Sequence, residues 1–189
     1  MELVYKNLVI RKAVGNDAEQ LCVWWNDGRI MAQMGLPNGV GCKPEDVRKS
    51  LDENKDKYRH IIELDGKPIG EMNNRDMNGE KGTAEPGIKI CDFSEQNKGY
   101  GTILLTIFID ALFRYYNYEK VILDTGIKNE RAQYVYEKKL GFRHIMTEKN
   151  DDPDELGIYE HIVYFEMNKA DWLASQNEPL DYTHSYSAE

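Results

Sequence analysis

Cysteine is scarce in this chain of 189 residues, and the three that it has, Cys22, Cys42 and Cys91, are widely spaced. Their odd number and spacing give no disulfide framework and no Cys-x-x-Cys metal pair. We therefore expect them to fill small spaces in a core. The four histidines are scattered too, without His-x-x-x-His or mixed Cys/His spacing, so no metal site is predicted.

Long apolar runs are also missing. No stretch approaches the roughly 20 apolar residues that a membrane-spanning helix needs. Residues 1–6 lack the charged start and the apolar core of a signal peptide. From these absences we expect a cytoplasmic protein with no membrane partner.

Positive charge is in the minority, with 24 Lys and Arg against 33 Asp and Glu and a formal net charge of −9. A nucleic-acid-binding domain usually presents a basic face, so no nucleic-acid partner is expected. The acidic balance favours cationic partners by long-range attraction, and the alternative is that it serves solubility alone.

The length suits one domain with a proper core. From Asp171 to the end the chain has four acidic residues and neither Lys nor Arg. We expect a folded domain over residues 1–170 and an acidic, polar tail over residues 171–189. Such a tail is either disordered or docked on a neighbour, as in a homodimer.

β-prone and helical segments alternate along the chain. Asp65-Gly66 between two β-prone runs is a strong hairpin signal. A compact apolar strand after a helix suggests a crossover connection and a locally parallel pair. The expected strands, in order, are 8–11, 60–64, 67–72, 83–90, 121–123, 143–147 and 157–167. Helices are expected to begin after Asn16 or Asp17, at Pro44, after Gly101 and at Asn129, with a short helix over residues 29–34 as an option.

The segment Gln-Asn-Lys-Gly-Tyr-Gly-Thr, Gln96 to Thr102, lies between a predicted strand and an apolar helical run. Free backbone N–H groups gather where a helix begins and favour a phosphate. Gly99 and Gly101 leave the main chain open, and Lys98 adds a positive charge. The third glycine of a dinucleotide fingerprint and the Gly-Lys-Ser/Thr of a Walker loop are absent. We predict a pyrophosphate cradle, with an ordinary loop before a helix as the alternative.

Two blocks carry a resemblance to a known family. Gln96-Asn-Lys-Gly-Tyr-Gly101 matches the pattern Gln/Arg-x-x-Gly-x-Gly/Ala. Asn129-Glu-Arg-Ala-Gln-Tyr-Val-Tyr-Glu-Lys-Lys-Leu-Gly-Phe142 is similar to Asn-x-x-Ala-x-x-x-Tyr-Glu-Lys-x-Gly-Phe. Both patterns are typical of the GCN5-related N-acetyltransferase (GNAT) family, which this chain therefore resembles. One extra lysine, at position 138 or 139, is expected to bulge the helix end without affecting Tyr136.

The resemblance spans residues 8–167 and implies the fold class. This is an α/β (α+β) fold with a central, mixed and mostly antiparallel sheet, flanked by helices and splayed between its fourth and fifth strands. Those strands are residues 83–90 and 121–123 here. Trp24-Trp25-Asn26-Asp27 with the glycine-rich loop after it resembles the branch of ribosomal-protein N-terminal and aminoglycoside acetyltransferases.

Acetyl-CoA is the cosubstrate that the resemblance implies, and no metal is implied. N–H groups around the glycine loop would hold its pyrophosphate, and the main chain of the splayed strand would pair with its pantetheine arm. Asn129 would contact that arm as well. The expected cofactor-binding residues are Ile88, Ile90, Gln96, Lys98, Gly99, Tyr100, Gly101, Thr102 and Asn129.

Two residues are the catalytic candidates. Tyr136 stands where the family often uses a tyrosine to protonate the departing sulfur, and the alternative is an aromatic side chain that only packs. Glu85 begins the splayed strand and could accept the amine's proton directly or through water. Glu71 and Glu63 on the hairpin are alternative bases. The alternative without a catalytic role is that Glu85 is a carboxylate that faces the solvent.

The resemblance implies direct attack of an amine on the thioester. Residues 148–160 hold six acidic residues against one lysine and would overhang the acceptor side, which favours a small cationic acceptor such as an aminoglycoside or polyamine. A solvated acidic loop is the alternative. Two other functions stay open: acetylation of a protein N-terminus, and a non-catalytic acyl-CoA-binding regulatory module.

Overall fold

The structure is a computed structural model of the chain. It describes residues 1–55, 58–76, 82–151, 153–154, 156–158, 160–176 and 180–185. Asp152 and Glu155, two of the six acidic residues of segment 148–160, lie outside the described residues.

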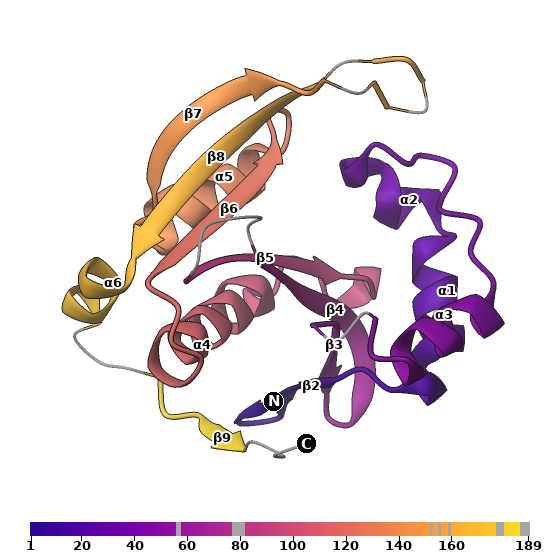
Figure 1. Cartoon of the computed structure of the whole chain (residues 1–189), viewed down its shortest axis with the longest axis horizontal. Coiled ribbons are helices and arrows are strands. Elements are labelled where there is room, and N and C mark those ends of the chain that lie inside the picture. The colour runs from indigo at the N-terminus through magenta and orange to yellow at the C-terminus, as the bar shows by residue number, and fades with distance from the viewer. Residues whose placement is uncertain are drawn as a thin grey trace.

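One mixed sheet forms the centre of the molecule (Figure 1), and the described residues contribute nine strands to it in the order β7-β8-β6-β5-β4-β3-β2-β1-β9. All neighbouring strands are antiparallel except β5 and β6, which are parallel. The strands are β1 (Glu2–Tyr5), β2 (Leu8–Lys12), β3 (His60–Leu64), β4 (Lys67–Asp76), β5 (Thr83–Ile90), β6 (Lys120–Gly126), β7 (Arg143–Lys149), β8 (His161–Asn168) and β9 (Thr183–Ser185).

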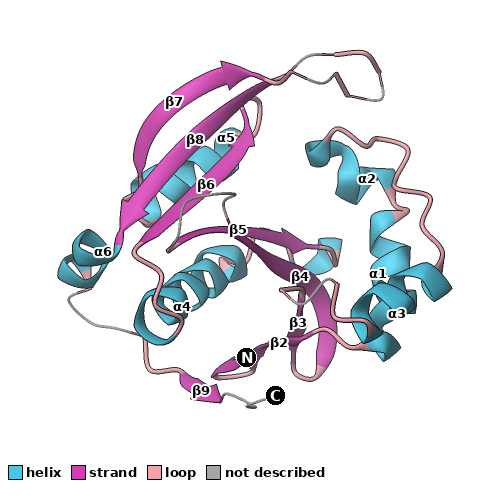
Figure 2. Cartoon of the chain, viewed as in Figure 1, coloured by secondary structure: helices cyan, strands magenta, loops and turns pink. Residues whose placement is uncertain are grey.

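Helices flank the sheet on both faces (Figure 2). They are α1 (Ala18–Trp25), α2 (Gly28–Met31), α3 (Pro44–Asp52), α4 (Tyr100–Tyr115), α5 (Glu130–Tyr134) and α6 (Lys169–Ser175). Short 3-10 turns occupy Gly15–Asp17, Ala32–Met34 and Phe93–Glu95, and a π-helical turn, Val135–Lys139, continues α5.

The alternation of side chains along β3 explains the two-sided packing. Ile62 belongs to the main core with α4, whereas its neighbour Ile61 packs with α1 and α3. Both are fully buried. The predicted fold class, a mixed and mostly antiparallel sheet flanked by helices, is confirmed.

The sheet opens between β5 and β6. Their ladder consists of Thr83 opposite Lys120 and Ala84 opposite Val121, and it ends there. Pro86 follows two residues later, and a proline, which has no N–H to donate, is tolerated in a strand where one side lacks a partner. The predicted splay between the fourth and fifth expected strands, and their parallel pairing, are therefore confirmed.

The C-terminal segment is attached to its own chain. β9 pairs with β1, with Leu3 opposite His184. Asp110 in the middle of α4 accepts hydrogen bonds from Trp172 Nε1 at 3.0 Å and Tyr182 Oη at 2.9 Å. Disorder therefore does not describe residues 180–185, and docking on a neighbour stays a prediction. The domain boundary at residue 170 stays a prediction.

One expected strand begins later than predicted. β8 starts at His161 and not at residue 157, because Asp154 Oδ1 accepts the backbone N–H groups of Leu156 and Ile158 in a turn. None of the helices in the described part of the chain is long and apolar enough to cross a bilayer.

Candidate active site

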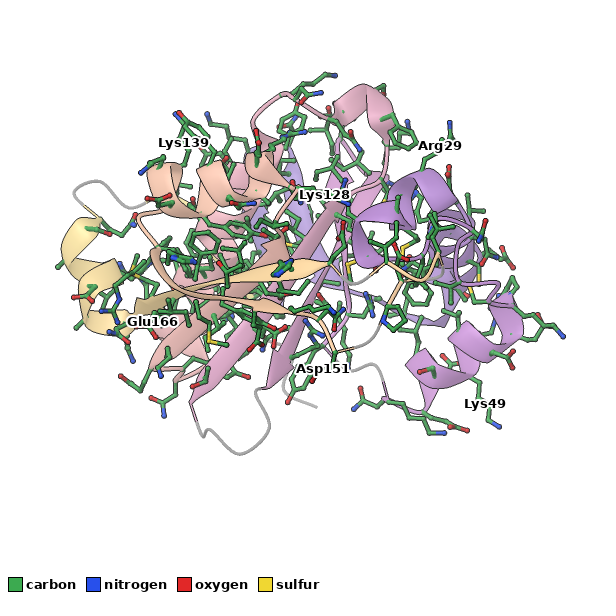
Figure 3. The ribbon with its side chains drawn as sticks, turned by 90° about the horizontal axis from the view of Figure 1, so that it is seen from above. Arg29, Lys49, Lys128, Lys139, Asp151 and Glu166 are labelled. Carbon is green, nitrogen blue, oxygen red and sulfur yellow. The ribbon has the colours of Figure 1, made fainter. Side chains whose placement is uncertain are left out.

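A cavity of about 700 Å³ lies at the opening between β5 and β6. Its lining residues are Gln33, Met34, Gly35, Leu36, Arg59, Glu71, Asn73, Arg75, Pro86, Gly87, Ile88, Lys89, Asp124, Thr125, Gly126, Asn129, Tyr136, Asn150, Pro153, Asp154, Ile158, Glu160, Ile162 and Tyr164. In the view of Figure 3, Lys128 and Asp151 lie between the helical end that carries Arg29 and Lys49 and the opposite end with Lys139 and Glu166.

Both faces of the sheet contribute to the cavity wall. Tyr136 and Asn129 come from the face that α4 and α5 cover, since Tyr136 belongs to the same core as α4. Glu71 comes from the other face, where Trp25 of α1 donates to it. The cavity therefore passes through the sheet where the strands part, and a molecule bound on one face can meet a molecule bound on the other.

Tyr136 is 9% exposed and lines the cavity. Its ring packs edge-on to Phe165 of β8, with centroids 5.7 Å apart. Burial, and then the charge of Asp124, raise the pKa of Tyr136 well above its ordinary value. The phenol is therefore protonated at neutral pH, as a group that donates a proton must be.

The extra lysine before Gly141 is accommodated by the π-helical turn Val135–Lys139, in which Leu140 N–H bonds Val135 C=O at 3.0 Å. A single inserted residue commonly produces such a bulge. The predicted bulge is confirmed, but the expectation that it would not involve Tyr136 is wrong, because Tyr136 is itself part of the π turn.

Glu85 lies just outside the cavity and contacts two charged residues that line it. Arg75 on β4 donates to Glu85 and places its Nη2 3.6 Å from Asp124 Oδ1. Burial raises the pKa of Glu85 to about 7, Arg75 opposes this, and the charge and hydrogen bond of Asp124 add to it. With this raised pKa, Glu85 holds a proton up to near-neutral pH.

The two alternative bases are held differently. Glu71 lines the cavity but is 1% exposed and accepts from Trp25 Nε1 at 2.8 Å, Arg59 at 2.7 Å and Lys89 at 2.7 Å. Although burial opposes ionisation, Arg59 and Lys89, with the hydrogen bond from Trp25, lower the pKa of Glu71. A carboxylate so stabilised is a weak proton acceptor. Glu63 does not line the cavity, and it pairs with Arg11 at 2.8 Å.

The glycine loop lies beyond the cavity, at the N-terminus of α4. Gln96 Nε2 donates to the carbonyl of Ile90 at 2.8 Å, which fastens the loop to the end of β5. Gly99 adopts φ +86°, a conformation that favours glycine. A Cβ atom added at Gly99 or Gly101 would meet nothing within 4 Å. The open main chain at a helix start is what an anion needs, whereas the ammonium of Lys98 is paired with Glu95 at 2.9 Å.

Asn129 has a structural role as well as a place in the cavity wall. Its side chain accepts from Ala132 N–H at 3.2 Å, which caps α5, and donates to Thr125 Oγ1 at 3.0 Å. Ile88 of β5 also lines the cavity, and Ile90 does not. The assignment of the nine predicted cofactor-binding residues to acetyl-CoA stays a prediction.

Residue patterns did not single out Asp124, Arg75 or Tyr164, all of which line the cavity. Asp124 is opposite Tyr164 in the β6–β8 ladder. The one available signal was a carboxylate at the C-terminal end of the apolar run Val121-Ile122-Leu123, since side chains there face a topological opening. Across the described residues, no three His, Cys, Asp or Glu side chains gather as a metal site requires.

Comparison with known proteins agrees with this geometry. The model of the GNAT acetyltransferase domain matches residues 7–143. None of the curated proteins compared with the chain matches it in sequence.

Among solved structures, spermidine N-acetyltransferase from Vibrio cholerae, in complex with CoA and spermine, is 20% identical with a TM-score of 0.77, covering 88% of this chain and 98% of that one. A GNAT acetyltransferase from Bacillus anthracis is 21% identical (TM-score 0.75; 90% and 99% covered). Ribosomal-protein-alanine N-acetyltransferase from Brucella melitensis is 18% identical with a TM-score of 0.69, covering 84% of this chain and 98% of that one. At these identities the similarity concerns the fold, and the family match decides membership: this chain belongs to the GNAT acetyltransferase family.

Proposed function

We propose that the protein is an acetyl-CoA-dependent N-acetyltransferase that passes the acetyl group directly from the thioester to a primary amine. The observation that carries the proposal is the cavity through the sheet, which has a protonated phenol, Tyr136, in its wall and a carboxyl pair, Asp124 with Glu85, at the splay point. Such a transfer requires one group that accepts a proton and another that donates one.

The donor side is supported by two features of the backbone. The main chain at Gly99 and Gly101 is open to an anion, which suits a pyrophosphate. The β5 ladder to β6 ends at Ala84, so the strand has main-chain groups available to a pantetheine arm from there onward. The predicted contacts of Gln96, Tyr100, Thr102 and Asn129 belong to this proposal.

On the acceptor side, an ammonium entering the cavity meets Asp124 first, because Asp124 lines the cavity and Glu85 stands behind it. The pair takes a proton from the ammonium, and the neutral nitrogen then attacks the carbonyl carbon of the thioester. The C–S bond breaks as the C–N bond forms. Tyr136 donates its proton to the departing sulfur, which leaves as a thiol.

A small cationic acceptor is the substrate class that we favour. Besides Asp124, the cavity wall contains Asp154 and Glu160 from the segment between β7 and β8. Glu160 is paired with Lys128 at 2.9 Å, whereas Asp124 has only the longer contact with Arg75 at 3.6 Å, so Asp124 and Asp154 are the carboxylates best placed for a cationic ligand. An aminoglycoside or a polyamine would have the required amines.

An N-terminal peptide is the second candidate acceptor, and one observation favours it. Met34 and Ile158 both line the cavity and are 57% and 46% exposed, so the mouth of the cavity has an apolar rim. Exposed apolar side chains around an opening suit a peptide chain. A cytoplasmic location and a homodimer stay predictions.

The test is incubation with acetyl-CoA and, separately, spermidine, spermine, an aminoglycoside and short peptides. Both thiol release and the mass of the acetylated product are recorded, because the protein's own cysteines also react in a thiol assay. Amine-dependent thiol release with an acetylated product supports the proposal. Asp124→Asn should lower the rate of that release most for the cationic acceptors. Binding of acetyl-CoA without transfer to any amine would contradict it and favour a regulatory acyl-CoA-binding module.

A further inference from the structure

Two of the three cysteines lie side by side in the core cluster that packs α1 and α3 against the sheet. The Sγ atoms of Cys22, in α1, and Cys42, in the loop before α3, are 2.9 Å apart, and both residues are free thiols. Cys91 is separate, with its Sγ atom near the carbonyl of Lys89. The sequence-based expectation that all three cysteines are core fillers is therefore incomplete, because Cys42 is only half-buried.

The loop that carries Cys42 is held against α1 by contacts that do not involve sulfur. The side chain of Asn26 accepts from Cys42 N–H at 2.9 Å and donates to Cys42 C=O at 3.0 Å. Val40 N–H bonds the carbonyl of Trp25 at 2.8 Å. Gly39 has φ +78°, and a Cβ atom there would lie 2.5 Å from Asn26 O, so the loop packs closely. Because the backbone already holds the two thiols together, joining them requires little rearrangement.

We propose that Cys22 and Cys42 form a reversible disulfide, with a peroxide as the oxidant. Cys42, the more exposed thiol, is oxidised first: its sulfur attacks one oxygen of hydrogen peroxide, the O–O bond breaks as the S–O bond forms, and the other oxygen leaves as water with the thiol proton, so that Cys42 becomes a sulfenic acid. The sulfur of Cys22 then attacks that of Cys42. The S–O bond breaks, the S–S bond forms, and the thiol proton of Cys22 leaves with the hydroxyl as water.

The environment of Cys22 affects how the pair responds. Burial raises the pKa of Cys22 to about 12, and its contact with Cys42 and the charges of Glu45 and Asp46 act in the same direction. A thiol with a high pKa is a poor leaving group in thiol–disulfide exchange. The disulfide, once formed, is thus slow to be reduced, and the Cys22 thiol, which is seldom ionised at neutral pH, is slow to attack.

The cross-link would act on the acceptor side of the cavity. The segment between the two cysteines contains α2 and, after it, four residues that line the cavity: Gln33, Met34, Gly35 and Leu36. A disulfide closing this loop restricts the movement of that wall. The glycine loop and β5 lie outside the closed segment. This consequence rests on the proposed function, and it predicts a changed KM for the amine with an unchanged KM for acetyl-CoA.

The test uses the full chain, reduced or treated with hydrogen peroxide, alongside Cys22→Ser, Cys42→Ser and, as the matched control, Cys91→Ser. The wild type and Cys91→Ser should lose two thiols, with an intact mass lower by two hydrogen atoms and a peptide linking Cys22 to Cys42, and a reductant should restore them. Cross-linking a loop of about 20 residues should raise the Tm by about 5–10 °C. Neither Cys22→Ser nor Cys42→Ser should form the bond.

A peroxide-treated wild type that retains both thiols, or that links Cys91 or a second molecule instead, would overturn the proposal. An oxidised form with the same amine KM would overturn the predicted effect on the cavity wall. The mass and the Tm are measured without substrate, so a protein that forms the disulfide yet acetylates no amine would contradict the proposed function and not the disulfide.

Discussion

Arg75 on β4 reaches across the splayed strand to Asp124 on β6, with Nη2 3.6 Å from Oδ1. The arginine also donates to Glu85 on β5, so one guanidinium connects the two sides of the opening at the point where the strands separate. It keeps two carboxyl groups close together, and their mutual charge adds to the effect of burial on Glu85. The pH dependence of the reaction should report on this arrangement.

We expect kcat/KM of the wild type to rise with pH through about 7. A base acts in its ionised form, and burial raises the pKa of Glu85 from 4.5 to about 7. Glu85→Gln should lose that limb of the profile and fall about 10²-fold in kcat/KM at pH 8. Glu63→Gln, which changes a carboxylate outside the cavity, is the control. A wild-type profile in Glu85→Gln would remove Glu85 as the base.

The same raised pKa affects stability. Between pH 4.5 and about 7 the folded protein holds a proton on Glu85 that the unfolded chain has released, so this residue lowers the free energy of unfolding as the pH rises. Glu85→Gln should therefore gain stability relative to the wild type at pH 8 but not at pH 4. Urea unfolding at the two pH values measures the difference, and a gain that is equal at both would contradict this linkage.

Tyr136→Phe should lower kcat by about 10²-fold, because the departing thiolate loses its proton donor. The ring remains, so its packing on Phe165 and the affinity for acetyl-CoA should change little. Tyr134→Phe is the matched control, since Tyr134 is 55% exposed and does not line the cavity. Full turnover by Tyr136→Phe would leave the phenol a packing role alone.

Gly101→Ala tests the cradle separately from catalysis. The added methyl group has open space in the unliganded protein, and alanine favours a helix more than glycine does, so the Tm should be equal or higher. If the pyrophosphate approaches this main chain, the Kd for acetyl-CoA should rise about 10-fold, or about 1.4 kcal/mol. Thr106→Ala, further along α4, is the control. An unchanged Kd would place the phosphates elsewhere.

Asp110→Asn should destabilise the fold by about 3 kcal/mol, because it removes a buried charge with partners on three segments. Asp110 is 5% exposed and bonds Arg114, Trp172 and Tyr182. Thermal unfolding measures the loss, with the exposed Asp171→Asn as control. Activity below the melting transition should be retained, since Asp110 does not line the cavity. A Tm equal to that of the wild type would show that these bonds contribute little.

Local signals in the sequence predicted those elements whose cause is local. Asp65 and Gly66 take φ +51° and +75°, as a tight turn between antiparallel strands requires, and the β3–β4 hairpin follows. The hairpin of β1 and β2 was missed because its turn uses Lys6, at φ +55°, where no glycine marks the position.

The site was harder to predict because its members meet through tertiary structure. Tyr136 became a candidate through the resemblance of the block from Asn129 to Phe142 to a family pattern, which needs no knowledge of the fold. Asp124 approaches Glu85 because β5 and β6 are parallel neighbours for two residue pairs and then part. A strand-end aspartate is common in any sequence, and only this geometry gives it a partner. The adjacency of Cys22 and Cys42 is likewise a product of how the loop folds back on α1.

The end of the β5–β6 ladder at Ala84 bears on how such proteins diversify. The binding groups that the opening makes available on β5 are N–H and C=O groups of the main chain, and every residue except proline provides both. Mutation can therefore change the side chains of this strand while the groups offered to the donor persist. Carboxylates such as Asp124 and Asp154 have no such protection, since one base change can remove them. In the proposed reaction, the amine acceptor can thus change through a few side-chain substitutions, while β5 keeps its main-chain groups.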